Sequence, residues 1–177
     1  DNGGVVNRGN PNAAAALDAG LAINGTLRGG KHDIWEGGFR EPFLVRWPAG
    51  IKAGTRSDAM ALNIDFAPTF LEAAGLPASK EMQGRSLLPL LHRRTPADWR
   101  TSMYYRYYHD PGDHNTRAHY GVRTRTHKLI YFWKKDQWEL FDLVNDPYEL
   151  HNLYGEPGQD ALTAHLKAEL ARLKREV

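Results

Sequence analysis

The segment 27–42 reads LRGGKHDIWEGGFREP and places Lys31 between two Gly-Gly pairs. Glycine has no Cβ atom, so it lets a backbone turn tightly or approach a ligand closely. A lysine held in such a loop is a compact cation that suits an anionic oxygen. An ordinary loop with a solvated lysine would show the same residues, so this pattern alone leaves both interpretations open.

Composition sets limits on the class of protein. The chain has 177 residues, a hydrophobic fraction of 41%, a charged fraction of 25% and a net charge of +2. These values are typical of a globular protein. The charge is too small, and too evenly interleaved with acidic residues, to indicate nucleic acid or a membrane surface as a partner. The chain contains no cysteine, which excludes disulfides, thiolate metal sites and a cysteine nucleophile within these residues.

The start of the chain does not look like a native N-terminus. It lacks an initiator methionine and begins DNGG, which is typical of the inside of a turn. We therefore expect a truncated or processed fragment, in which a signal peptide would not be visible.

The elements that must position Lys31 differ between the two halves. In the first half, the apolar run 42–48, bounded by prolines, predicts a buried strand of a parallel or mixed sheet. The segment 65–75 predicts a helix that Asp65 caps and Gly75 ends.

The second half has β character. Short strands are predicted at 103–108, 121–126, 128–133 and 138–143, with a hairpin turn at 134–137. Both faces of the third strand are apolar, so we expect it to lie inside the sheet. Leucines at 162, 166, 170 and 173 form the buried stripe of a final helix over 160–176. An antiparallel sheet of about four strands, packed by this C-terminal helix, is the natural arrangement.

Five motifs in order make the chain resemble the sulfatase family. They are the DNG turn at 1–3, LRGGK at 27–31 followed by EGGFREP at 36–42, the helix at 65–75, GRSLLPLL at 84–91, and the segments 122–131 and 139–153. The resemblance is to formylglycine-dependent, type I members, and is closest to N-acetylglucosamine-6-sulfatase-like and bacterial arylsulfatase-like proteins. It implies the C-terminal part of an alkaline-phosphatase-like α/β fold. Residues 1–98 would belong to the catalytic domain and 99–177 to a C-terminal subdomain.

The resemblance also implies roles for residues. Asp1 and Asn2 would complete a calcium site, and calcium does favour carboxylate and amide oxygens; a plain Asx turn is the alternative. Lys31 would be the catalytic residue that stabilises charge on the sulfate oxygens. The formylglycine nucleophile arises in a Cys/Ser-x-Pro-x-Arg motif, which is absent here. We expect that motif upstream, and the isolated fragment to be inactive.

The substrate side is predicted in 104–123, which is dense in Tyr, His and Arg. Aromatic rings stack on sugars, and His or Arg binds hydroxyl and sulfate groups. His119 is the leading substrate contact, followed by Arg40 and His109. Alternatively, the tyrosines pack the sheet, the histidines lie in surface loops, and Arg28 and Arg40 are structural residues that pair with Glu36 or Glu41.

The sequence therefore predicts part of a sulfatase that hydrolyses sulfate esters of sulfated small molecules or carbohydrates. The family resemblance implies a periplasmic or secreted location. Two other functions remain open: a phosphomonoester or phosphonate hydrolase of the same superfamily, and a non-catalytic sugar-binding fragment of a pseudoenzyme.

Overall fold

A computed structural model of the chain describes residues 3–112 and 115–177. The elements, in chain order, are α1 (Pro11–Asp18), α2 (Glu36–Phe39), the 3-10 helix η1 (Asn63–Asp65), α3 (Phe66–Ala73), α4 (Leu88–Leu91), β1 (Ser102–Tyr107), β2 (His119–Thr124), β3 (His127–Phe132), β4 (Gln137–Asp142) and α5 (Asp160–Lys174). They form two compact units, one of residues 1–43 with 104–171 and one of 44–103 with 172–177. The predicted division at 98/99 remains a prediction.

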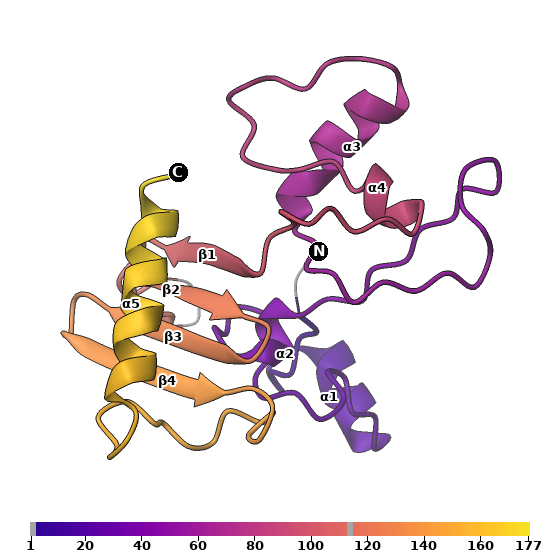
Figure 1. Cartoon of the computed structure of the whole chain (residues 1–177). Helices are drawn as coiled ribbons and strands as arrows, with labels where there is room; N and C mark the ends of the chain where they lie inside the picture. The colour runs from indigo at the N-terminus through magenta and orange to yellow at the C-terminus, as the bar shows by residue number, and fades with distance from the viewer. Residues whose placement is uncertain (1–2, 113–114) are drawn as a thin grey trace. The chain divides into compact units, whose positions relative to one another are not determined.

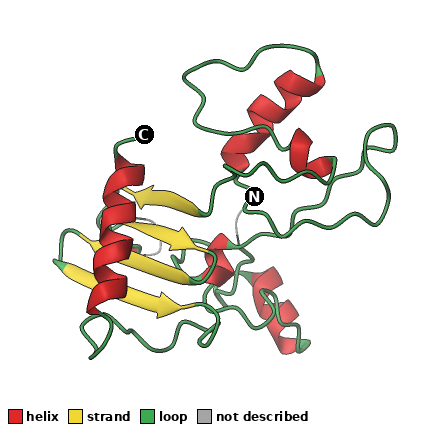
Figure 2. Cartoon of the chain, in the orientation of Figure 1, coloured by secondary structure: helices red, strands yellow, loops and turns green. Residues whose placement is uncertain are grey.

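The first unit contains a four-stranded sheet with the order β1-β2-β3-β4 (Figures 1 and 2). Both β2–β3 and β3–β4 are antiparallel, with Val122 opposite Leu129 and Leu129 opposite Leu140. Short connections, residues 125–126 and 133–136, join β2 to β3 and β3 to β4, as antiparallel neighbours allow, whereas the longer segment 108–118 joins β1 to β2. The predicted four-stranded antiparallel subdomain with a C-terminal helix is confirmed.

The two faces of this sheet pack against different partners. Val122, Leu129 and Leu140 share one face and are completely buried, and α5, which buries Leu166 and Leu170, crosses that side (Figure 1). Side chains alternate between faces along a strand. The opposite face therefore carries Ile130 and Phe141, which form a core cluster with Ile34.

The second unit is organised around α3 and a small core of Leu87, Leu90 and Trp99. The predicted helix over 65–75 is present, but Asp65 does not cap it with its side chain. Its buried carboxylate instead accepts hydrogen bonds from two backbone amides and pairs with Arg100.

The strand predicted at 42–48 is wrong for this chain. In the structure this segment has no regular conformation, and Leu44 is 93% exposed. A strand requires a neighbour for its backbone groups, and the strands of the described sheet do not include one that pairs with this segment. In the described ranges 3–112 and 115–177, no helix is both long enough and apolar enough to cross a membrane.

Candidate functional site

The two Gly-Gly pairs pack against each other. A Cβ atom on Gly37 would lie 2.4 Å from the carbonyl oxygen of Gly29, and one on Gly38 would lie 2.3 Å from that of Gly30. These approaches leave no room for a side chain. The backbone amide of Gly37 also donates to Arg28 O at 2.8 Å. The glycines therefore close residues 28–38 into a tight loop, which we call the lysine loop because it carries Lys31.

Lys31 lies near the start of this loop, with its backbone fixed and its side chain exposed. Its amide donates to Gly4 O at 3.0 Å, and Asn24 holds the neighbouring turn by donating to Gly29 O at 2.9 Å. The Lys31 ammonium group can therefore reach an anionic oxygen from a backbone position that does not change.

A pocket of about 280 Å³ lies beside the lysine loop in the first unit. Its walls come from the lysine loop and its C-terminal end, from β1, and from the segment that leads into β2. The lining residues are Lys31, His32, Asp33, Ile34, Gly38, Phe39, Tyr105, Arg106, Tyr107, Thr116 and His119. The structure thus brings Lys31 and His119, which are far apart in sequence, into one pocket.

His119 begins β2 and is 5% exposed. Its Nδ1 lies 2.7 Å from Arg117 O. A carbonyl oxygen can only accept, so Nδ1 carries the hydrogen and Nε2 keeps its lone pair. Burial lowers the pKa of His119, and the bond to Arg117 only partly opposes this. The ring is therefore a neutral side chain that can accept a hydrogen bond from a sugar hydroxyl.

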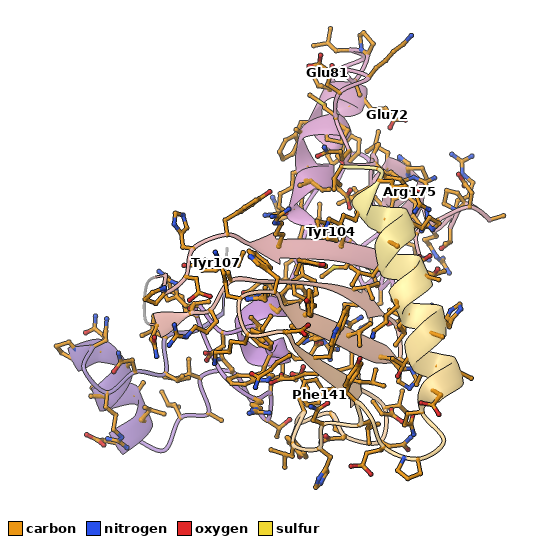
Figure 3. The ribbon with its side chains drawn as sticks, turned by 90° about the vertical axis from the view of Figure 1, so that its left-hand side faces the viewer. Glu72, Glu81, Tyr104, Tyr107, Phe141 and Arg175 are labelled. Atoms are coloured by element: carbon orange, nitrogen blue, oxygen red, sulfur yellow. The ribbon has the colours of Figure 1, made fainter. Side chains whose placement is uncertain are left out.

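Aromatic rings surround His119 on the pocket wall. Tyr107 stacks on it with ring centroids 5.8 Å apart, and Tyr105 meets it edge-on at 5.9 Å. Figure 3 shows Tyr107 on β1 with its side chain drawn. Tyr105 also packs edge-on against Phe39 at 4.8 Å. Such a wall offers apolar ring faces and edges of the kind that sugar rings pack against.

The tyrosines on the other face of the sheet pack among themselves, as the alternative interpretation proposed. Tyr120 contacts Tyr131 edge-on at 5.4 Å, and Tyr131 stacks on Trp138 at 4.2 Å. Cross-strand aromatic pairs of this kind stabilise a sheet.

The rim of the pocket is tied to the lysine loop. The Thr116 hydroxyl donates to His32 O at 3.1 Å, and the neighbouring Arg117 pairs with Asp110 at 3.0 Å. His32 has a φ of 78°, a left-handed conformation that is uncommon outside glycine. The residue after Lys31 therefore holds a strained backbone turn beside the pocket.

Arg40 and His109 are exposed and do not line this pocket. The ring of His109 lies edge-on to Tyr107 at 5.9 Å, one ring away from His119. Their roles as substrate contacts remain predictions. Glu36, one of the two glutamates predicted as partners of Arg28 or Arg40, pairs with Arg123 at 2.9 Å.

Sequence reasoning missed a buried group of charges behind the pocket. Glu36, Arg123, Lys128 and Glu149 form ion pairs with one another, and we call them the buried charge cluster. The signal that could have found it is a lysine inside an apolar strand, at Lys128 of β3, because such a residue requires an acidic partner.

No candidate metal site is found among the residues that the structure describes. In the ranges 3–112 and 115–177, no three His, Asp or Glu side chains come together in a way that could hold an ion. The predicted calcium ligands, Asp1 and Asn2, lie outside the described residues.

With this geometry established, comparison with known proteins identifies the class. Residues 30–176 match the family described as N-sulphoglucosamine sulphohydrolase, C-terminal. The chain belongs to this sulfatase family, and the predicted family is confirmed.

Particular relatives share both sequence and fold. An N-acetylglucosamine-6-O-sulfatase of Bacteroides thetaiotaomicron is 42% identical over 83% of this chain and 25% of its own length. A protein solved in complex with its substrate D-glucosamine-2-N,6-O-disulfate is 42% identical, with a TM-score of 0.71 over 74% of this chain and 27% of that one. A phosphonate monoester hydrolase from Silicibacter pomeroyi is 25% identical, with a TM-score of 0.71 over 84% and 31%. These neighbours confirm the predicted fold class, and the chain spans about a quarter to a third of their length.

Proposed function

We propose that this chain is the C-terminal part of a sulfatase that hydrolyses sulfate esters of sulfated sugars. The observation that carries the proposal is the pocket that joins Lys31 to His119 and its aromatic wall. A sulfated sugar has an anionic sulfate group and a ring that bears hydroxyl groups. The Lys31 cation suits the sulfate, and the aromatic rings with the neutral acceptor His119 suit the sugar ring and its hydroxyls. The relatives named for sulfated glucosamine support this substrate class.

Each group has a role in this proposal. The Lys31 ammonium contacts sulfate oxygens and stabilises the charge that builds up on them as the ester bond breaks. His119 accepts a hydrogen bond from a sugar hydroxyl, and the rings of Tyr105 and Tyr107 pack against the sugar. Arg40 and His109 contact parts of the substrate that extend beyond the pocket.

The groups that break the bond come from outside this chain. A formylglycine would supply the nucleophile, and a calcium ion that Asp1 and Asn2 would help to hold would supply a further positive charge. This chain contributes the substrate-facing wall and the Lys31 cation. The location proposed for the whole protein is periplasmic or secreted, as the sulfatase resemblance implies.

The test uses the full-length protein that contains this chain. We expect turnover of glucosamine 6-sulfate and of a chromogenic aryl sulfate, and little turnover of phosphate or phosphonate monoesters. Lys31→Ala should lower kcat/KM on both sulfates by roughly a hundredfold, the scale seen when a preorganised charge-stabilising donor is lost. Lys52→Ala, an exposed lysine of the second unit, is the matched control.

The other outcomes are distinct. Preference for phosphonate monoesters would replace this proposal with a phosphonate hydrolase, for which the neighbour from Silicibacter pomeroyi is the precedent. Binding of sulfated sugar without turnover of any ester would indicate a pseudoenzyme. Unchanged turnover in Lys31→Ala would remove Lys31 from the site.

A further inference from the structure

The buried charge cluster lies on the sheet face that packs against the lysine loop. Lys128 and Glu149 are 0% exposed and Glu36 is 3% exposed. Lys128 Nζ lies 2.9 Å from Glu36 and 2.7 Å from Glu149, and Arg123 lies 2.9 Å from Glu36. The free energy needed to remove these charges from water offsets much of the free energy gained from their attraction, so the cluster does not by itself account for stability. Its presence calls for another explanation.

The cluster binds backbone groups of the lysine loop as well as charges. Lys128 Nζ donates to Ile34 O at 3.2 Å, and the amide of Glu36 donates to Glu149 Oε2 at 2.6 Å. The guanidinium of Arg28, at the start of the loop, donates to Glu149 O. These contacts fall on both sides of Lys31. The first two satisfy backbone groups of the loop, at Ile34 and Glu36, and the third binds the loop's first side chain to the backbone of Glu149.

Glu149 is the centre of this arrangement. Its φ of 52° is a left-handed conformation that costs free energy outside glycine. In this conformation its carboxylate reaches Lys128 and Glu36 while its carbonyl oxygen reaches Arg28. Lys128 also lies 5.2 Å from the ring centre of Phe39, which lines the pocket. One buried residue thus connects both ends of the loop to β3 and to the pocket wall.

From these contacts we infer that Glu149, through Lys128 and Arg28, is a positioning residue that sets where Lys31 stands in the pocket. The inference rests on the proposed function for its effect on turnover. It acts through the backbone on either side of Lys31, and Glu149 itself touches no substrate. A small displacement of a charge-stabilising group costs much of its effect, because the group must meet the reacting oxygen where charge develops.

The test is a double-mutant cycle in the full-length protein. Glu149→Gln keeps the size of the side chain and removes its charge. In the wild-type background it should lower kcat/KM on the aryl sulfate roughly tenfold or more. In the Lys31→Ala background the same substitution should lower kcat/KM less than about twofold, because the lysine side chain through which Glu149 acts is already absent. Glu156→Gln, an exposed glutamate, is the matched control and should change neither background.

Amide hydrogen exchange gives a readout that does not need turnover. Exchange of residues 29–38 should be at least about tenfold faster in Glu149→Gln, while that of α5 stays as in the wild type. Arg28→Lys removes the guanidinium that donates to Glu149 O and lies 3.7 Å from the centre of the Trp35 ring, and should show the same pattern if Glu149→Gln does not fold. A wild-type protein without sulfatase activity would refute the proposed function, and the exchange data would still decide the positioning. Equal losses in both backgrounds, or unchanged exchange in the loop, would overturn the inference.

Discussion

Replacing Asp65 with alanine should destabilise the second unit more than any change on its surface. The Asp65 side chain is 0% exposed and receives backbone amides of Leu62 and Arg85, each at 2.8 Å. Its carboxylate also binds the Arg100 guanidinium with two contacts, one of them at 2.7 Å. Alanine would leave two amides and a nearly buried guanidinium without their acceptor.

The expected loss follows from these contacts. Removing one partner of a buried charge pair costs about 3–5 kcal/mol, chiefly because the other charge stays buried. Such a loss is a large part of the roughly 5–15 kcal/mol that stabilises a typical domain. Asp98→Ala is the matched control, because Asp98 pairs with Arg85 at 3.0 Å but its side chain is 80% exposed. Exposed pairs contribute about 0–1 kcal/mol.

Urea denaturation of the chain, followed by tryptophan fluorescence, measures both variants. Trp99 is a suitable reporter because it lies in the same core and donates to Met60 O at 2.9 Å. With a slope of about 2 kcal/mol per molar urea, Asp65→Ala should lower the midpoint by roughly 1.5–2.5 M. A shift no larger than that of Asp98→Ala would refute the reasoning that Asp65 organises this unit.

Three further predictions concern the first unit. His119→Ala in the full-length protein should lower kcat/KM about threefold to tenfold on the sulfated sugar, which corresponds to the loss of one neutral hydrogen bond, and less than twofold on an aryl sulfate. Because burial lowers the pKa of His119, this loss should be the same at about pH 7 and pH 8. A loss that changes between these pH values would contradict a neutral ring. Gly37→Ala should cost about 1–3 kcal/mol in urea denaturation, because its Cβ would meet the backbone oxygen of Gly29 at 2.4 Å, and an unchanged midpoint would show that the loop can widen. Burial raises the pKa of Glu139 more than Arg28 lowers it, so ionisation of this side chain opposes folding as pH rises above the unfolded value of 4.5. Glu139→Gln should therefore raise the free energy of unfolding at pH 7, by at most about 1 kcal/mol because the side chain is only partly buried and solvent screens its charge. This gain should disappear below about pH 4, and an equal gain at both pH values would exclude the charge as its cause.

Local patterns predicted the sheet and the final helix because those elements are determined by nearby residues. The apolar faces of β3 and the leucine spacing of α5 repeat with the periods of a strand and a helix. Asp65 shows where such reasoning fails. An aspartate before a helix fits a cap, but a charge partner 35 residues away, Arg100, provides more contacts in the fold. The strand predicted at 42–48 is absent for a related reason. The composition of this segment suits a strand, but strand pairing depends on residues elsewhere in the chain.

The candidate site was predictable by residue type but not by arrangement. Glycines, a lysine and histidines indicated which side chains could do chemistry, and both Lys31 and His119 do line one pocket. The buried charge cluster depends on a contact between Lys128 and Glu149 that no local pattern specifies. Long-range ion pairs of this kind follow from the packing of the loop on the sheet, so they become visible only in the fold.

The distribution of charge around the pocket accounts for the need to hold Lys31 in place. Within the buried charge cluster, the two carboxylates of Glu36 and Glu149 lie next to two cations, Lys128 and Arg123. Opposite charges about 3 Å apart largely cancel at a distance, so these four residues add little net field at the pocket. His119 is neutral because burial lowers its pKa. Two cations among the described residues line the pocket, Lys31 and Arg106. The Arg106 guanidinium lies over the rings of Tyr108 and Trp133, 4.4 and 5.1 Å from their centres. Lys31 lies on a loop, and its exposed side chain can meet one sulfate oxygen reliably only if its backbone does not move.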